Sequence, residues 1–107
     1  QKLAFSLESF QSTHEGELVD AIQKAGKDCA GIILNAGAYT HTSIAIMDAL
    51  LAVSIPVIEV HMSNIFRREE FRHESYVSKA AKGVICGFGS NSYLLAIEAM
   101  AELLKKK

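Results

Sequence analysis

The chain has 107 residues, 50% of them hydrophobic, which suits one compact domain covering residues 1–107 and is too short for two. Eleven Lys and Arg residues stand against 12 Asp and Glu, so the formal net charge is −1 and no broad positive field is available for a phosphate backbone. We therefore expect no nucleic-acid partner. Polar residues interrupt the most apolar region, 49–60, so we also expect no membrane span.

The first third of the chain predicts a strand and then a helix. Residues 7–11 have the pattern of a short strand. Ser12, with Glu15 three residues later, is a capping-box pattern that opens a helix, and Gly26 supplies a stop. The apolar positions of this helix fall at helical spacing: Leu18, Val19, Ile22 and Ala25.

The middle of the chain predicts two strands with a helix between them. Residues 30–34 form a continuous apolar run, typical of a strand buried on both faces of a parallel sheet. A Gly-containing loop, 35–43, precedes apolar residues at helical spacing: Ile44, Met47, Leu50 and Leu51. Residues 56–61 form the next predicted strand, with Pro56 at the first position, where a missing N–H does little harm.

The last third adds one strand and one helix. A polar, charged segment, 62–76, precedes a predicted strand at 83–86, and Ser90 or Asn91 can cap a helix over 93–104. Alternating strands and helices with right-handed crossovers indicate a doubly wound α/β fold, a parallel sheet with helices on both sides. Ligands bind beyond the carboxyl ends of such strands.

Polar side chains do follow these predicted strand ends. Asn35, Tyr39 and His41 come after one strand, and Ser63 and Asn64 come after the next. This density of polar residues makes the carboxyl edge of the sheet the candidate site.

Glu59 and His61 stand two residues apart in a predicted strand, so their side chains point to the same face. A carboxylate in an apolar strand needs a partner, and His61 is near enough to be one. The carboxylate would favour the protonated imidazole and make His61 a candidate general acid. Alternatively, Glu59 pairs with a lysine or arginine and His61 is an ordinary polar residue, and the residues alone leave both interpretations open.

Residues 62–65 lie between that strand and a short predicted helix, so their backbone N–H groups could bind an anion such as a carboxylate. Asn64 could equally serve only as a helix cap. Arg72 could bind vicinal hydroxyls or a carboxylate, whereas the neighbouring charges at 67–70 resemble a solvated turn.

Several other sites are excluded by their patterns. Residues 87–89, Gly-Phe-Gly, lack the third glycine of a dinucleotide loop because position 92 is Ser. The four histidines have neither Cys partners nor helical pair spacing, so we expect no metal. No Gly-x-Ser-x-Gly elbow occurs, and no cluster of aspartates ends a strand as in a phosphoryl-accepting receiver.

Five segments together resemble the type II 3-dehydroquinate dehydratases: residues 10–17 (FQSTHEGE), 35–43 (NAGAYTHTS), 58–64 (IEVHMSN), 68–72 (REEFR) and 83–89 (GVICGFG). The resemblance covers nearly the whole chain. It implies a flavodoxin-like fold of three layers, a place in the shikimate pathway of aromatic amino acid biosynthesis, and trimers that associate into a dodecamer. It also implies a cytoplasmic protein. The two cysteines agree, because Cys86 lies in an apolar run where a buried thiol needs no disulfide partner.

The resemblance further implies dehydration of 3-dehydroquinate to 3-dehydroshikimate by anti elimination through an enolate, with no cofactor. His61 would protonate the departing C1 hydroxyl, and Glu59 would orient His61. Of the substrate contacts, Asn35 would hold the region of the C1 hydroxyl and carboxylate, and the backbone of Met62 and Ser63 would bind the carboxylate. The ring hydroxyls would be contacted by His41 and Arg72, and Asp48 would reach into a neighbouring subunit's site.

Two departures qualify this resemblance. Ala36 stands where the family usually has proline. The family also begins with a strand, a flexible lid that holds an arginine and the base tyrosine, and a first helix, none of which is in this sequence. If the chain is complete, we expect it to fold poorly and to be essentially inactive, because loss of a general base costs on the order of 10² to 10⁴ in rate. The alternative is a non-catalytic, flavodoxin-like binding subunit.

Overall fold

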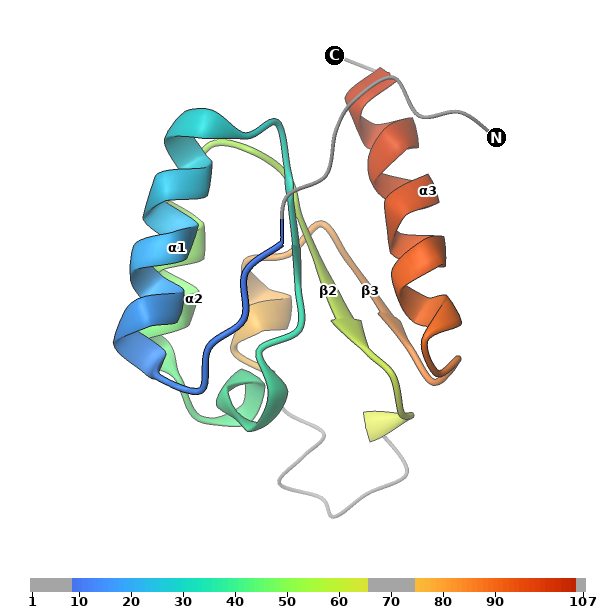
Figure 1. The fold of residues 1–107 in the computed structure, drawn as a ribbon, viewed down its shortest axis with the longest axis horizontal. Helices are drawn as coiled ribbons and strands as arrows, with labels where there is room; N and C mark the ends of the chain where they lie inside the picture. Colours follow the sequence, from blue (N-terminus) through green and yellow to red (C-terminus); the bar gives the residue numbers. More distant parts are fainter. Residues whose placement is uncertain (1–8, 66–74, 106–107) are drawn as a thin grey trace.

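The computed structural model describes residues 9–65 and 75–105, so the candidate residue Arg72 lies outside the described part. The elements, in chain order, are α1 (Glu15–Asp28), β1 (Ile32–Leu34), η1 (Gly37–His41), α2 (Ile44–Ala52), β2 (Val57–His61), η4 (Val77–Lys79), β3 (Gly83–Cys86) and α3 (Asn91–Lys105). Figure 1 shows the sheet between a pair of helices, α1 and α2, and the single helix α3.

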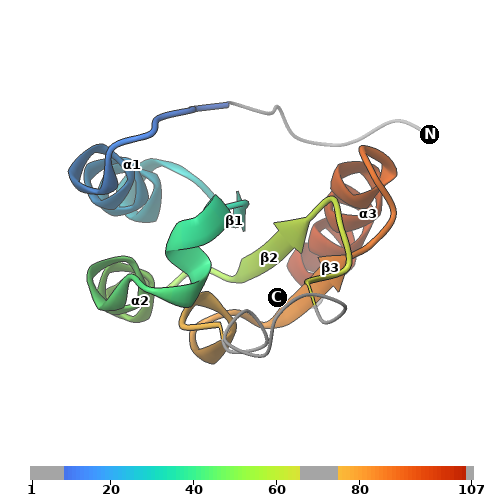
Figure 2. The ribbon, with the colours of Figure 1, turned by 90° about the horizontal axis from the view of Figure 1, so that it is seen from below.

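The described strands form a parallel sheet in the order β1-β2-β3. The register pairs Leu34 with Glu59, and His61 with Cys86, so β2 extends further than β1 at the carboxyl edge. Seen from below, α1 and α2 cover one face and α3 covers the other (Figure 2). The prediction of a three-layered, doubly wound α/β fold is confirmed.

The central strand β2 divides the core into two halves. All five of its residues are buried. Val57 packs into one hydrophobic cluster with residues of α1 and α2, whereas Ile58 and Val60 pack against Ala96 and Met100 of α3. Because side chains alternate along a strand, Glu59 and His61 share the face of Val57, and a charged group is thereby placed beside an apolar cluster.

The start of α1 differs from its prediction. His14 occupies the N-cap position without a side-chain hydrogen bond to the helix. Ser12 Oγ instead accepts from the His14 N–H at 3.0 Å and donates to Glu17. The predicted Ser12–Glu15 capping box is therefore wrong, because the helix begins too late for Ser12 to be its cap.

Gly26 does not stop α1, which continues to Asp28. A Cβ at Gly26 would lie 2.5 Å from Cγ1 of Val53, the residue that follows α2. The glycine is thus explained by the close approach of α1 to the end of α2, and the helix has no need of a left-handed residue there.

The described part of the strand predicted at 7–11, residues 9–11, has no strand structure. A strand requires a hydrogen-bonded neighbour, and within the described residues the sheet contains only β1, β2 and β3. Phe10 is 57% exposed. This prediction is wrong for the residues that can be checked, whereas the strand predicted at 83–86 is confirmed as β3.

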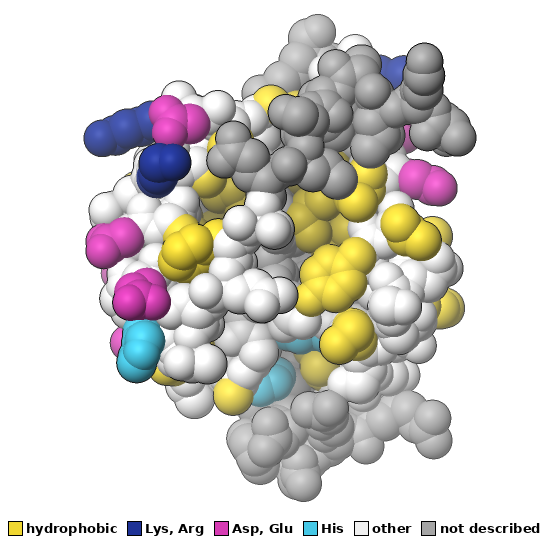
Figure 3. Space-filling view, in the orientation of Figure 1, with side chains coloured by type: hydrophobic (Ala, Val, Ile, Leu, Met, Phe, Trp, Pro, Cys, Tyr) yellow, Lys and Arg dark blue, Asp and Glu magenta, His cyan; other side chains and the backbone are white. Residues whose placement is uncertain are grey.

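Surface character differs between the two sides of the sheet. In Figure 3 the charged side chains on the left lie over α1, and hydrophobic side chains gather towards α3. Leu94 of α3 is 60% exposed. None of the helices in the described part is long and apolar enough to cross a membrane.

Candidate active site

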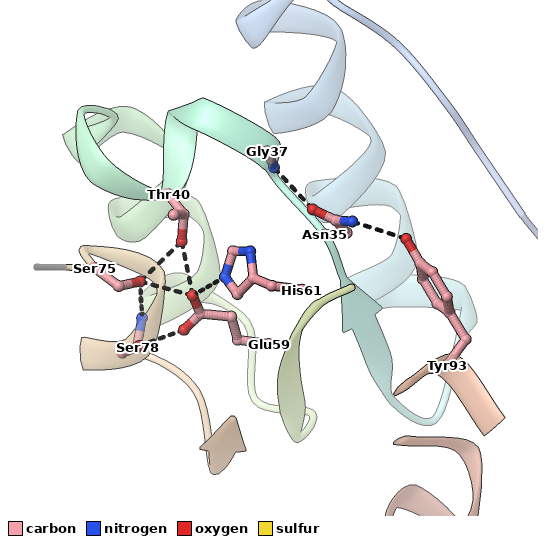
Figure 4. Close-up of polar contacts among 8 residues, drawn as sticks. All are labelled: Asn35, Gly37, Thr40, Glu59, His61, Ser75, Ser78 and Tyr93. Carbon is pink, nitrogen blue, oxygen red and sulfur yellow. Dashed lines mark hydrogen bonds and ion pairs between the residues drawn. The ribbon is translucent and has the colours of Figure 1, made fainter. Parts of the chain in front are cut away.

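Glu59 and His61 form a buried pair at the carboxyl end of β2. The two residues are 0% and 6% exposed, and Nε2 of His61 is hydrogen-bonded to Oε2 of Glu59. The predicted contact between the two residues is therefore present, and Figure 4 shows the imidazole turned towards the carboxylate. Their catalytic roles remain predictions.

Three hydroxyl groups from other elements surround the same carboxylate (Figure 4). Thr40 of η1 and Ser75 donate to Oε2 of Glu59, with oxygen–oxygen distances of 2.8 and 2.9 Å. Ser78 of η4 donates to Oε1. The hydroxyls and the imidazole together satisfy a charge that would otherwise be costly to bury.

These donors determine the protonation state of Glu59. Burial alone raises the pKa of the carboxyl group, because it disfavours the charged form. Hydrogen bonds from His61, Ser78, Thr40 and Ser75 outweigh burial and hold the pKa of Glu59 below its ordinary value of 4.5. Glu59 is therefore an anion at neutral pH.

The Glu59 contact also distinguishes the two ring nitrogens of His61. Nε2 faces the ionised carboxylate, which accepts a hydrogen bond from the Nε2–H group. Within the described residues, Nδ1 has no hydrogen bond. A hydrogen bond from one ring nitrogen to a carboxylate fixes the tautomer and the orientation of an imidazole. Nδ1 is therefore the atom with which His61 can exchange a proton with a ligand.

Asn35 follows β1 and is held by two different hydrogen bonds. Its Oδ1 accepts from the Gly37 N–H at 3.0 Å, and its Nδ2 donates to the hydroxyl of Tyr93 at 2.9 Å. Gly37 adopts a φ of 60°, which a side chain would strain. Figure 4 shows the amide lying between Gly37 and Tyr93. No direct hydrogen bond joins Asn35 to His61 among the described contacts.

The turn after β2 is tied to the loop after β3. The backbone N–H of Gly89 donates to the Met62 carbonyl at 2.8 Å, and that of Gly87 donates to the His61 carbonyl at 3.2 Å. Met62 and Ser63 are exposed beyond the buried end of the strand. They thus lie at the predicted edge, where a ligand can reach them.

The remaining candidates lie at different depths. His41 ends η1 and is half-buried, whereas Asp48 is exposed on α2. The structure places neither in hydrogen-bond contact with Glu59. In the part of the chain that is described, no group of three His, Cys, Asp or Glu residues is arranged to hold a metal ion.

Four residues of this region were not predicted from the sequence: Thr40, Ser75, Ser78 and Tyr93. They lie 16 to 19 residues from Glu59, or 58 residues from Asn35, so only the tertiary fold brings them into contact. One signal was available, since a buried carboxylate requires more donors than one histidine supplies.

A separate cavity of about 590 Å³ lies between Ser9, Phe10 and α1. Its lining includes Glu17, Asp20 and Lys24 but neither Glu59 nor His61. The chemistry of the carboxyl edge, rather than the size of this cavity, identifies the candidate site.

Comparison with known proteins gives a consistent result. The family model described as "Dehydroquinase class II" matches residues 1–101. The chain is 56% identical over 105 residues to a 3-dehydroquinate dehydratase of Prochlorococcus marinus, covering 98% of this chain and 72% of that protein. It is 57% identical over 101 residues to 3-dehydroquinate dehydratase 1 of Agrobacterium fabrum, covering 94% and 70%.

Solved structures agree in fold. A type II dehydroquinase from Butyrivibrio crossotus is 49% identical with a TM-score of 0.84, over 87% of this chain and 66% of that chain. A 3-dehydroquinate dehydratase-like protein from Bifidobacterium longum is 32% identical with a TM-score of 0.70, over 89% and 71%. This chain thus spans 66% to 72% of the length of these relatives.

Proposed function

Because this chain belongs to the class II dehydroquinase family, we propose that it takes part in the dehydration of 3-dehydroquinate to 3-dehydroshikimate. The observation that carries the proposal is the buried Glu59–His61 pair at the carboxyl edge of the sheet. An enzyme that eliminates water from a cyclic hydroxy ketone must protonate a poor leaving group. A histidine held against a carboxylate is suited to that step.

In the proposed reaction, His61 acts as the general acid. Removal of a C2 proton by a base gives an enolate, which then expels the C1 hydroxyl to form the C1–C2 double bond. His61 donates its Nδ1 proton to the departing oxygen, so that water leaves and the imidazole becomes neutral. Glu59 stays ionised and stabilises the imidazolium before the transfer. We assign no described residue to the base step.

The substrate would be held by groups around this pair. We propose that Asn35 contacts the region of the C1 hydroxyl and carboxylate, and that the backbone of Met62 and Ser63 binds the carboxylate. His41 and Arg72 would contact the ring hydroxyls. The turn after β2 supports the carboxylate assignment, because Met62 and Ser63 are exposed at the carboxyl edge of the sheet.

We also propose a homo-oligomer, in which trimers associate into a dodecamer and Asp48 reaches a neighbouring subunit's site. Ile44, Asp48 and Leu51 lie on one face of α2, and the two apolar residues are 53% and 58% exposed. Exposed apolar side chains around a carboxylate suit a contact between subunits. Leu51→Glu should reduce the mass of the particle in analytical ultracentrifugation, and an unchanged mass would contradict this interface.

A cytoplasmic location is proposed as well. Cys29 and Cys86 are both free thiols, which agrees with a reducing compartment.

The decisive experiment compares His61→Ala with His14→Ala. His14 is an exposed histidine at the start of α1 and serves as the matched control. Dehydration is followed by the enone absorbance of the product. We expect His61→Ala to lose on the order of 10² to 10⁴ in kcat, the usual cost of removing a general acid, while His14→Ala retains the activity.

Ligand binding supplies the second readout. The thermal stabilisation of each variant by 3-dehydroshikimate is measured alongside turnover. Full turnover by His61→Ala would refute the role of His61. Binding of the product without any turnover by the unsubstituted protein would favour a binding subunit over an enzyme.

A further inference from the structure

The Glu59 carboxylate is enclosed by hydroxyl groups that β2 does not supply. Thr40 comes from η1, and Ser75 and Ser78 come from the segment that contains η4. Thr40 is 0% exposed and Ser75 is 7% exposed. We call these three residues the hydroxyl cage.

The cage is itself held in place by backbone hydrogen bonds. The Tyr76 N–H donates to the Thr40 carbonyl at 2.7 Å and thereby joins the two segments. The Ser78 N–H donates to Ser75 Oγ at 3.0 Å. Since Ser75 Oγ already accepts this bond, its own hydrogen is available for the carboxylate.

Counting hydrogens shows which state of Glu59 the cage fits. Thr40 Oγ1 and Ser75 Oγ lie 2.8 Å apart, and each is also within hydrogen-bond distance of Oε2. Two hydroxyls have two hydrogens for these three contacts. The hydrogens of Thr40, Ser75 and Ser78 and the N–H of His61 Nε2 can all point to Glu59 only if its carboxylate is an anion, because a protonated carboxyl would need one of these four groups as an acceptor.

We propose that Thr40, Ser75 and Ser78 are positioning residues of the enzyme, which fix the Glu59 carboxylate against Nε2 of His61 and leave Nδ1 for the substrate. The inference rests on the proposed function, since it assigns these residues to the same proton transfer. None of the three touches the reacting atoms. They act through Glu59, by keeping the proton of the Glu59–His61 pair on the imidazole.

Other titratable groups on these elements are Tyr39 and His41 of η1, Tyr76 and Lys79 beside or within η4, and Cys86 of β3. The described contacts of Glu59 include none of these five. The cage and His61 are therefore the groups whose removal should change the titration of Glu59.

The test removes one hydroxyl at a time with Ser78→Ala and Thr40→Val, and Thr40→Ser restores a hydroxyl. Ser43→Ala is the control, because Ser43 is buried, as Thr40 is, and also donates to a carboxylate, that of Glu15, on another element. The Glu59 carboxyl is titrated by ¹³C NMR in the free protein. Its pKa should rise by about one pH unit in Ser78→Ala and Thr40→Val, and by much less in Thr40→Ser and Ser43→Ala.

Turnover gives the functional readout. The acidic limb of the kcat profile should move upwards by about the same amount in Ser78→Ala and Thr40→Val, with KM changed less than kcat. Ser43→Ala should lose stability but keep the profile. A Glu59 titration and a kcat profile that stay unchanged in both cage variants would overturn the proposal.

The two proposals fail in different ways. If His61→Ala retains full turnover, the role of His61 in catalysis is wrong, whatever the cage does to Glu59. If His61→Ala is inactive but the cage variants titrate and turn over like the unsubstituted protein, only the positioning role is wrong. Ser78 is only partly buried, so Ser78→Ala still gives an answer should Thr40→Val fail to fold.

Discussion

Ser43 and Ser75 form the same local hydrogen bonds in two regions of the molecule. Ser43 Oγ accepts from the Ile46 N–H at 2.9 Å and donates to Glu15. Ser75 Oγ accepts from the Ser78 N–H at 3.0 Å and donates to Glu59 at 2.9 Å. The two serines are 2% and 7% exposed.

The two carboxylates differ in what surrounds them. Glu15 is half-buried in the first turn of α1, where its charge also complements the helix dipole. Glu59 is fully buried in the central strand and has four described donors. One contact thus joins α1 to α2, whereas the other belongs to a polar group in the core. The same serine–carboxylate hydrogen bond connects two helices in one region and stabilises a buried carboxylate in the other.

Removal of the two carboxylates should give the largest difference. Glu59→Ala leaves three hydroxyls and an imidazole without their acceptor and opens a cavity, so we expect a loss of about 3–5 kcal/mol in the free energy of unfolding. Glu15→Ala should lose only about 1 kcal/mol. Urea denaturation measures both values. Equal losses would show that the burial of Glu59 does not distinguish the two sites.

The pH dependence of stability sharpens the same comparison. Because the folded pKa of Glu59 is lowered, the folded state binds fewer protons than the unfolded state at acidic pH. The contribution of Glu59 is therefore complete above its ordinary pKa of 4.5 and is lost as the pH falls through the lower folded value.

This contribution is measured by urea denaturation from about pH 6 to pH 3, with Glu59→Gln as the reference. The unsubstituted protein should lose more stability over this range than Glu59→Gln does. Glu15→Gln is the control and should keep most of the slope. A Glu59→Gln curve parallel to that of the unsubstituted protein would contradict the assignment.

Much of this fold could be predicted from the sequence, because its signals are local. Apolar runs such as 30–34 and 83–86 predicted strands that the structure confirms, and the spacing of Glu59 and His61 predicted their shared face. The strand predicted at 7–11 is absent from its described residues, 9–11, because pairing depends on a neighbouring strand that no local pattern supplies.

The hydroxyl cage could not be predicted for a related reason. Serine and threonine occur throughout the chain, and nothing adjacent to Thr40 or Ser78 marks them as partners of Glu59. Their contacts form only when η1 and η4 pack against β2. Gly26 shows the same limit. In the sequence this glycine predicted the end of a helix, whereas in the structure it allows the helix to approach Val53 closely.

Substitution of the two serines should have a smaller effect on stability than substitution of Glu59. Ser43→Ala removes a helix cap and should cost about 1 kcal/mol in the free energy of unfolding. Ser75→Ala should cost more, about 1–3 kcal/mol, because it leaves a buried carboxylate with one donor fewer. Urea denaturation at pH 7 measures both. A greater loss from Ser43→Ala would reverse the comparison and identify the α1–α2 contact as the more important one.

Tyr93→Phe should give the smallest effect, because it removes one hydrogen bond at the rim of the fold and leaves the aromatic ring in place. The Tyr93 hydroxyl accepts from Asn35 Nδ2 at 2.9 Å and is only partly shielded, with the side chain 36% exposed. Water can replace part of this bond, so we expect a loss of about 0.5–1 kcal/mol in the free energy of unfolding. Asn35 should nevertheless become more mobile, which ¹⁵N relaxation of its side-chain amide would detect. An unchanged amide would show that the Gly37 N–H alone holds Asn35, and that the Tyr93 contact, unlike those around Glu59, positions nothing.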